Sequence, residues 1–204
     1  MRSNGSESDR SFVTNARRAQ IVEAAIDTLA EVGYANASLA RIAVRLGISK
    51  GVISYHFAGK DDLVAEIVRQ VLEHARAYME PRVNSKSTGP EMLRAYIESN
   101  LEFIRDNPNQ LTAVMEIARA ALADGKRPTR ANADAGIRIL AEMLARFQSA
   151  GDFRPDFDPD AMAMAIRASI DAATRCLVDP AFDIDAYANE LATLFDRATH
   201  AASN

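Results

Sequence analysis

The sequence has little of what most enzymes, secreted proteins and membrane proteins depend on. Its 204 residues include one cysteine, three histidines and no tryptophan, and no apolar run reaches the length that a membrane span needs. Cys176 alone allows no intramolecular disulfide and argues against a cysteine-based zinc site; the simplest interpretation is a buried free thiol. The polar N-terminus has no apolar core of the signal-peptide type, which indicates a cytoplasmic protein.

Catalytic patterns are absent as well. The histidines, His56, His74 and His200, are scattered along the chain. No Ser-His-Asp set, metal-ligand spacing or glycine-rich phosphate loop accompanies them. We therefore expect a protein that is not an enzyme and needs no cofactor or metal.

Glycine and proline are also scarce, with nine and seven residues, and no sustained alternation of β-branched residues is present. The 48% hydrophobic content is ample for a core, so the sequence predicts an all-α fold of about nine helices. The net charge of −4 is unevenly distributed. Residues 1–60 carry eight basic and five acidic side chains, and residues 61–204 carry 16 and 23. A basic N-terminal third on an acidic remainder favours one end that faces DNA.

Breaks in the apolar periodicity suggest four segments. Residues 1–13 are polar and predict a disordered tail, and PRVNSKSTGP at 81–90 is the clearest interruption, with Pro81 expected to end a helix. The predicted segments are a tail (1–13), a DNA-binding domain (14–60), a connecting helix (61–80) and a ligand-binding and dimerisation domain (81–204). Helices are expected at about 14–32, 38–47, 49–57, 61–79, 91–106, 109–123, 129–150, 158–178 and 183–199.

The stretch SLARIAVRLGISKGVISYHF, residues 38–57, carries the most informative pattern. Ser38 and Ser49 are suitable N-caps for two short helices, and Gly47 supplies the left-handed conformation that ends the first. Ala43, Gly47 and Ile53 have the spacing of a helix-turn-helix, with a small residue at the helix crossing, a glycine at the turn and an aliphatic anchor on the second helix. Two packed helices without DNA affinity remain the alternative from spacing alone.

The continuation KGVISYHFAGKDDL, residues 50–63, resembles the motif of the TetR family of bacterial transcription regulators, and the resemblance extends over about residues 14–65. It implies phosphate contacts from Lys50, Tyr55, His56 and Lys60, and from the hydroxyl of Ser38. It also implies close backbone approach at Gly51 and a base-facing position at Val52. Ser54 departs from the family pattern, in which an aromatic residue is frequent, although a serine can still donate a hydrogen bond.

Two further assignments on this segment have competing interpretations. His56 is equally well explained as a packed histidine bonded to a nearby carbonyl. Arg17 and Arg18 fall in the first turn of the first predicted helix, where the helix dipole disfavours cations. Contact with phosphate would explain their position, and two solvated arginines would explain it equally well.

The C-terminal part suggests two more sites. Met and aromatic side chains at helical spacing predict either an apolar effector pocket or simply core, and embedded polar residues favour a pocket. The candidate pocket comprises Tyr96, Asn100, Phe103, Met115, Glu116, Arg119, Met143 and Phe147, and Glu116 with Arg119 could equally form a surface ion pair. The candidate dimer surface comprises Ala161, Ala165, Ala168, Ala172, Leu191, Leu194 and Phe195, where small residues permit close helix approach, either between two chains or within one.

Together these patterns predict a homodimeric regulator that represses transcription by binding a palindromic double-stranded operator and is released by a small-molecule effector. An architectural or cell-division factor that binds DNA without an effector is one alternative. A helical scaffold or enzyme with an incidental helix-turn-helix is a second. No membrane partner is expected.

Overall fold

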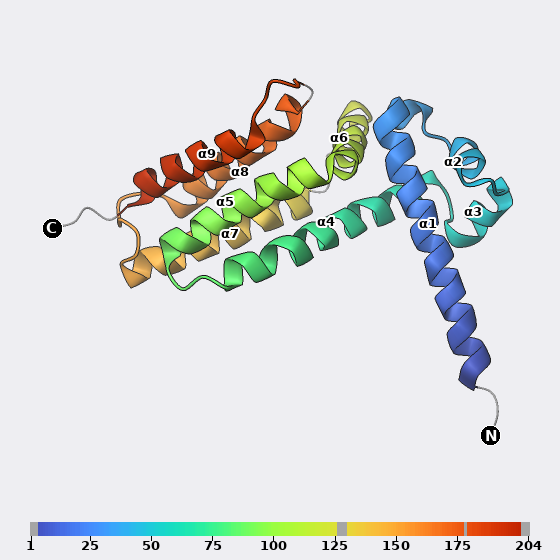
Figure 1. Cartoon of the computed structure of the whole chain (residues 1–204), viewed down its shortest axis with the longest axis horizontal. Coiled ribbons are helices and arrows are strands. Elements are labelled where there is room, and N and C mark those ends of the chain that lie inside the picture. Colours follow the sequence, from blue (N-terminus) through green and yellow to red (C-terminus); the bar gives the residue numbers. More distant parts are fainter. Residues whose placement is uncertain (1–3, 126–129, 178, 201–204) are drawn as a thin grey trace. The chain divides into compact units, whose positions relative to one another are not determined.

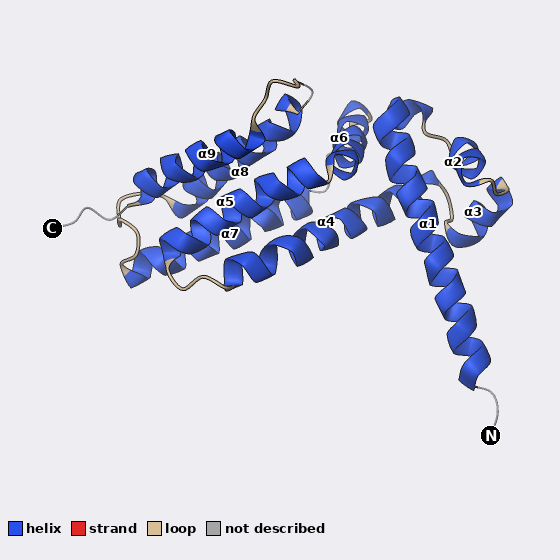
Figure 2. Ribbon diagram, viewed as in Figure 1, coloured by secondary structure: helices blue, strands red, loops and turns tan. Residues whose placement is uncertain are grey.

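The computed structural model describes residues 4–125, 130–177 and 179–200. Regular secondary structure within these ranges is entirely α-helical (Figure 2), which confirms the predicted fold class. The nine helices of the described ranges are α1 (Asn4–Asn36), α2 (Leu39–Leu46), α3 (Lys50–His56), α4 (Lys60–Asn84), α5 (Gly89–Asp106), α6 (Pro108–Ala123), α7 (Arg130–Ala150), α8 (Pro159–Cys176) and α9 (Ile184–Thr199) (Figure 1).

The chain divides into two compact units. The head unit consists of residues 1–72 and 109–126, and the body unit consists of residues 73–108 and 127–204. The predicted boundary lies at residues 81–90, whereas the division falls within α4. The predicted C-terminal domain includes residues 109–123, whereas α6 is part of the head unit. The head unit is therefore discontinuous in sequence.

The head unit has its own hydrophobic core, to which α1, α2, α3, α4 and α6 all contribute. Ile21, Ile53, Ile67 and Ala113 are fully buried and come from four of these helices. Burial of each large aliphatic side chain stabilises the fold by about 1.5–3 kcal/mol. The short helices α2 and α3 are too brief to be stable alone, so this shared core holds them in place.

In the body unit α5 is the central helix, with ten buried residues, and it packs against α7, α8 and α9. Its start is fixed by a capping box in which the Thr88 hydroxyl accepts from the Glu91 amide and the Glu91 carboxylate accepts from the Thr88 amide. The adjacent Gly89 amide donates to Asp152 Oδ2 at 2.7 Å, which ties the start of α5 to the loop after α7.

Three local predictions differ from the structure. The predicted disordered tail is helical from Asn4 onward, because a helix that is already packed extends at little cost through successive backbone hydrogen bonds. Pro81 lies inside α4 rather than after it; it is close enough to the end that its missing N–H removes one bond and one more turn still forms. Cys176, interpreted as a buried thiol, is exposed at the end of α8.

Candidate nucleic-acid interface

The helix-turn-helix predicted at residues 38–57 is present, and its capping residues behave as the sequence indicated. Ser38 Oγ accepts from the Arg41 amide at 3.2 Å, and Ser49 Oγ accepts from the Val52 amide at 3.4 Å. Gly47 adopts the left-handed conformation with φ 66° and ends α2. Its N–H donates to the Val44 carbonyl at 3.1 Å. These local bonds satisfy helix ends that would otherwise have no partner.

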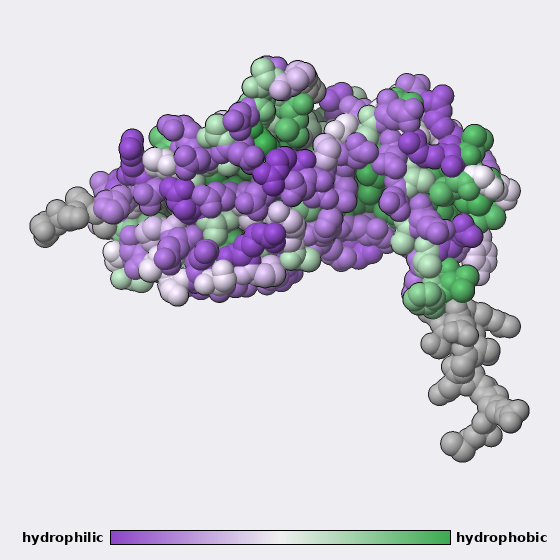
Figure 3. Space-filling model, viewed as in Figure 1, coloured by the Kyte–Doolittle hydropathy of each residue, from purple (hydrophilic) through white to green (hydrophobic). Residues whose placement is uncertain are grey.

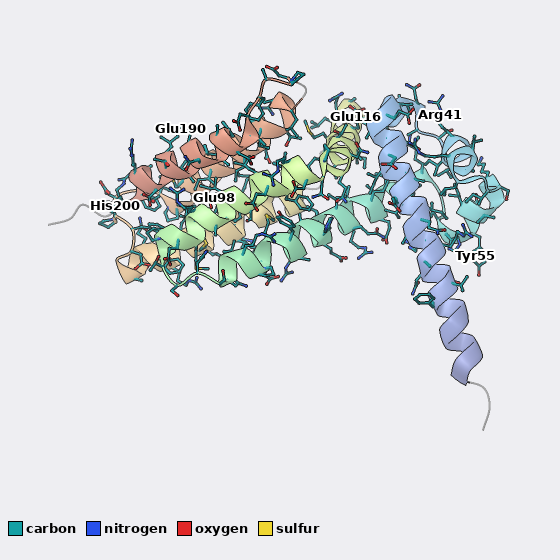
Figure 4. The ribbon with its side chains drawn as sticks, viewed as in Figure 1. Arg41, Tyr55, Glu98, Glu116, Glu190 and His200 are labelled. Carbon is teal, nitrogen blue, oxygen red and sulfur yellow. The ribbon has the colours of Figure 1, made fainter. Side chains whose placement is uncertain are left out.

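The contact between α2 and α3 leaves one face of the pair exposed. Ala43 and Ile53 are buried at the crossing, with 3% and 0% exposure. On the outer side, Val44 and Tyr55 are each 80% exposed (Figure 4 labels Tyr55). Lys50, Gly51 and Ser54 are exposed too, and Figure 3 shows hydrophobic residues at the surface over α2 and α3. We call the exposed residues 41, 44, 50–52, 54 and 55 the recognition surface.

His56 lies at the edge of this surface and is only partly exposed. Its ring meets the Tyr55 ring edge-on at a centroid distance of 5.1 Å, and its carbonyl accepts from Arg18 Nη1 at 2.6 Å. The packed-histidine interpretation expected the ring to bond to a neighbouring carbonyl, whereas the bond from Arg18 goes to the backbone carbonyl of His56 itself.

Arg18 is engaged within the head unit. Its guanidinium carbon lies 4.2 Å from the centre of the Phe57 ring, and Nη2 lies 3.6 Å from Glu66 Oε2. Bonds from Arg69, Gln70 and Arg18 lower the pKa of Glu66 to about 2, with Arg69 the largest cause. Arg18 therefore links α1 to the start of α4 rather than facing outward, whereas Arg17 is exposed.

Lys60 differs most from its expected role. The resemblance implied a loop lysine that pairs with phosphate, but Lys60 is the first residue of α4. Its Nζ donates to the Tyr34 carbonyl at 2.5 Å and lies 3.8 Å from the centre of the Tyr34 ring. Burial at this position lowers the pKa of the ammonium group, and nearby Asp61 partly offsets the shift.

Two members of the recognition surface were missed from the sequence. Arg41 and Val44 project from the exposed side of α2 (Figure 4 labels Arg41). The signal was available, because they fall between the apolar positions Leu39, Ile42, Ala43 and Leu46 that mark the inner face. Arg45, on the same helix, is paired with Glu31 of α1 at 2.7 Å.

The candidate pocket residues divide between the two units. Tyr96, Asn100, Phe103, Met143 and Phe147 belong to the body unit, and Met115, Glu116 and Arg119 belong to the head unit. The eight residues therefore do not assemble into one site inside either unit.

Within the body unit, several of these residues have structural partners. Asn100 is 5% exposed; its Nδ2 donates to the Tyr96 carbonyl and its Oδ1 accepts from Arg167 Nη1 at 3.0 Å. Phe103 is 3% exposed and packs against His74 and Tyr78 of α4. Phe147 packs against Phe153 at a centroid distance of 6.3 Å. Tyr96 and Met143 are partly exposed.

The candidate dimer surface is accessible only in part. Ala161, Ala165 and Ala168 are exposed along one side of α8, and Ala172 is half-buried. Leu194 of α9 is 56% exposed, next to α8 in the same unit, and Met164 adds an exposed apolar side chain at 60%. Leu191 and Phe195 are only 5% and 6% exposed within a single chain. These two belong to the body core, so their assignment to a dimer surface is corrected.

Comparison with known proteins agrees with this geometry. The family described as "Bacterial regulatory proteins, tetR family" matches residues 21–67, which contain α2 and α3 entirely. The match confirms the TetR-family resemblance over residues 21–67.

Similarity to individual members is modest. The HTH-type transcriptional regulator BetI 1 of Chromohalobacter salexigens is 39% identical over 87 residues, which cover 42% of this chain and 43% of that protein. The chain thus spans less than half the length of the first curated relatives it matches. These relatives are regulators, in agreement with the prediction that the chain is not an enzyme.

Solved structures extend the likeness across both units. A protein from a study of the control of antibiotic production by a bacterial hormone is 27% identical, with a TM-score of 0.76 and coverage of 91% and 98% of the two chains. AibR, solved with isovaleryl coenzyme A and operator DNA, has a TM-score of 0.73 at 21% identity and covers 87% and 97%.

The described ranges contain no cluster of three or more His, Cys, Asp or Glu residues suited to a metal ion. Among the described helices, none combines the length and apolarity needed to span a bilayer.

Proposed function

We propose that this protein is a sequence-specific, DNA-binding regulator of transcription that acts in the cytoplasm. The observation that carries the proposal is the recognition surface. Lys50, Tyr55 and Arg41 project from two capped helices whose opposite faces are anchored in the core, and no described part of the head unit covers them. A short helix with an outward-facing lysine and tyrosine suits the major groove and the adjacent phosphates.

The test is binding of the purified protein to the DNA upstream of its own gene, measured by fluorescence anisotropy across a salt series and against scrambled DNA. We expect selective binding whose affinity falls steeply with salt, because cations displaced from phosphates contribute a slope of about −0.9 per contact. Lys50→Ala should reduce the magnitude of that slope by about 0.9, the contribution of one phosphate contact.

Lys86→Ala is the matched control, since Lys86 is exposed in the loop between α4 and α5 and its loss removes the same charge. If both variants lower affinity equally, the effect is one of net charge and the recognition surface is not the binding site. If the wild type binds both DNAs equally and weakly, the architectural alternative is favoured.

A two-fold dimer through α8 and α9 is part of the same proposal. The exposed stripe of Ala161, Ala165 and Ala168 permits close approach of a second copy, and Met164 and Leu194 supply exposed apolar area beside it. A symmetric dimer suits a palindromic operator with half-sites about 34 Å apart. Ala165→Glu should yield monomers in sedimentation velocity, whereas Ala77→Glu, an exposed alanine of α4, should not.

Repression and its release by an effector complete the proposal. The support here is the likeness in fold to AibR, which was solved with both isovaleryl coenzyme A and operator DNA. Effector binding would favour a conformation of the dimer that no longer fits the operator. Acyl-coenzyme A thioesters are therefore the first compounds to add to the anisotropy assay. DNA affinity that no such compound changes would weaken this part of the proposal and leave DNA binding intact.

A further inference from the structure

Helix α6 is integrated into the DNA-binding head, although it follows α3 by more than fifty residues in sequence. Ala113 is fully buried in the head core, and Val114 and Ile117 pack against it. Asn109 Nδ2 donates to Asp27 Oδ1 of α1 at 3.0 Å. The position of α6 is therefore fixed by the same core that holds the helix-turn-helix.

Glu116 of α6 makes a specific bond to the end of α1 (Figure 4 labels Glu116). Its Oε2 accepts from the Tyr34 amide at 3.1 Å. The helical path of α1 is interrupted at the preceding residue, Gly33, which has φ 74° and ψ 167°. The carboxylate satisfies an amide at this interruption, and its other oxygen, Oε1, pairs with Arg119 Nη1 at 2.6 Å.

The carbonyl of the same residue, Tyr34, holds the start of α4. Lys60 Nζ donates to this carbonyl at 2.5 Å and lies over the Tyr34 ring. Lys60 is only four residues beyond His56, the last residue of α3, and Phe57 between them is 1% exposed. Tyr34 thus connects Glu116 of α6 to the corner between α3 and α4.

We propose that Glu116 is a positioning residue for the recognition helix α3, acting through Tyr34 and Lys60. Charge on Glu116 is secondary in this proposal, and the placement of its hydrogen-bond acceptor is what matters. The carboxylate fixes the end of α1, the end of α1 fixes Lys60, and Lys60 sets where α3 ends and α4 begins. This inference rests on the proposed DNA-binding function, because its main readout is affinity for DNA.

The test uses two variants of Glu116, one that changes its charge and one that changes its length, together with one control variant. Glu116→Gln removes the charge but keeps an acceptor oxygen at the same distance from the Tyr34 amide. Glu116→Asp keeps the charge but withdraws the carboxylate by one methylene. Arg119→Ala is the matched control, because it removes the ion pair and leaves the bond to Tyr34 in place.

We expect Glu116→Asp to weaken binding to the upstream DNA by about three- to tenfold at every salt concentration, as loss of one hydrogen bond that holds the binding arrangement implies. The salt slope should stay unchanged, since no phosphate contact is removed. Glu116→Gln and Arg119→Ala should remain within about twofold of wild type. Loss of affinity in Glu116→Gln with none in Glu116→Asp would overturn the proposal, as would a changed salt slope in Glu116→Asp.

Hydrogen exchange on the free protein supplies a readout that needs no DNA. Exchange at residues 57–63 should accelerate in Glu116→Asp and not in Arg119→Ala, because only the first loosens the α3–α4 corner. If the wild-type protein fails to bind DNA selectively while this exchange pattern holds, the proposed DNA-binding function is wrong, but the link from Glu116 through Tyr34 to the α3–α4 corner is supported. Equal exchange at residues 57–63 in all variants would refute the link from Glu116 through Tyr34 to the α3–α4 corner.

Discussion

Replacing Gly33 by alanine is a demanding test of the head structure. With φ 74° and ψ 167°, Gly33 lies in a backbone region that is essentially restricted to glycine, where another residue costs about 1–3 kcal/mol. An added Cβ would also lie 3.0 Å from Glu116 Oε2. Alanine reduces the entropy of the unfolded chain, which offsets about 0.4–1 kcal/mol. We expect a net loss of about 2 kcal/mol in the free energy of unfolding.

Gly47 provides the comparison within the same unit. It is left-handed, with φ 66° and ψ 29°, and an added Cβ would meet no atom within 4 Å. Gly47→Ala should therefore cost about 1 kcal/mol or less, after the same entropic offset. Asparagine adopts the left-handed region more readily than alanine, so Gly47→Asn should recover part of this loss, whereas Gly33→Asn should recover none.

Urea unfolding of the full-length protein, followed by circular dichroism, measures all four variants. The midpoint should fall furthest for the two Gly33 variants. If Gly33→Ala were no more destabilising than Gly47→Ala, or if asparagine rescued position 33, the conformation at the end of α1 would differ from the one described. The Gly33 variants should also weaken DNA binding, because they disturb the bond between Glu116 and Tyr34.

Three further outcomes follow from the head unit. Ser49→Ala should lower the free energy of unfolding by about 0.5–1 kcal/mol in the same urea assay, since it removes the N-cap of α3; no loss would show that the cap is dispensable. Because the pKa of Glu66 is about 2 in the fold and 4.5 ordinarily, its contribution to stability is complete above about pH 4.5 and is lost as pH falls toward 2. Glu66→Gln should therefore lower the free energy of unfolding by about 2–3 kcal/mol at pH 7 and make the urea midpoint less dependent on pH between pH 4.5 and 2. An unchanged dependence on pH in this range would contradict the lowered pKa of Glu66. Lys60→Gln should weaken DNA binding without changing its salt slope; a slope reduced by about 0.9 would mean that Lys60 leaves Tyr34 for a phosphate, as the sequence suggested.

What could be predicted from sequence was mainly local. Ser38, Gly47 and Ser49 define helix ends through bonds to residues three or four positions away, so their roles can be deduced from spacing alone. The inner faces of α2 and α3 were equally evident, because Ala43 and Ile53 belong to simple apolar patterns. The motif that carries the family resemblance lies in the same local segment.

The errors concern contacts between residues distant in sequence. The residues of α6 have the apolar spacing of any core helix, and nothing local indicates that Ala113 belongs to the same core as Ile21 rather than to the body. Glu116 and Arg119 looked like polar groups in a pocket, yet one bonds to Tyr34, 82 positions earlier in the chain. Lys60 was assigned by motif position, and its partner on α1 is not visible from spacing. Only the folded chain reveals such partners.

The discontinuity of the head unit also affects how the protein folds while it is being synthesised. Residues 73–108 separate the first part of the head from α6, and a ribosome adds these 36 residues in about 2–7 s. During that interval the nascent helix-turn-helix lacks Ala113, Val114 and Ile117, so the apolar surface that α6 covers remains open. In a protein truncated after α4, the apolar surface that α6 covers would stay exposed permanently. The core of the DNA-binding head thus includes a segment encoded well downstream of its recognition helix.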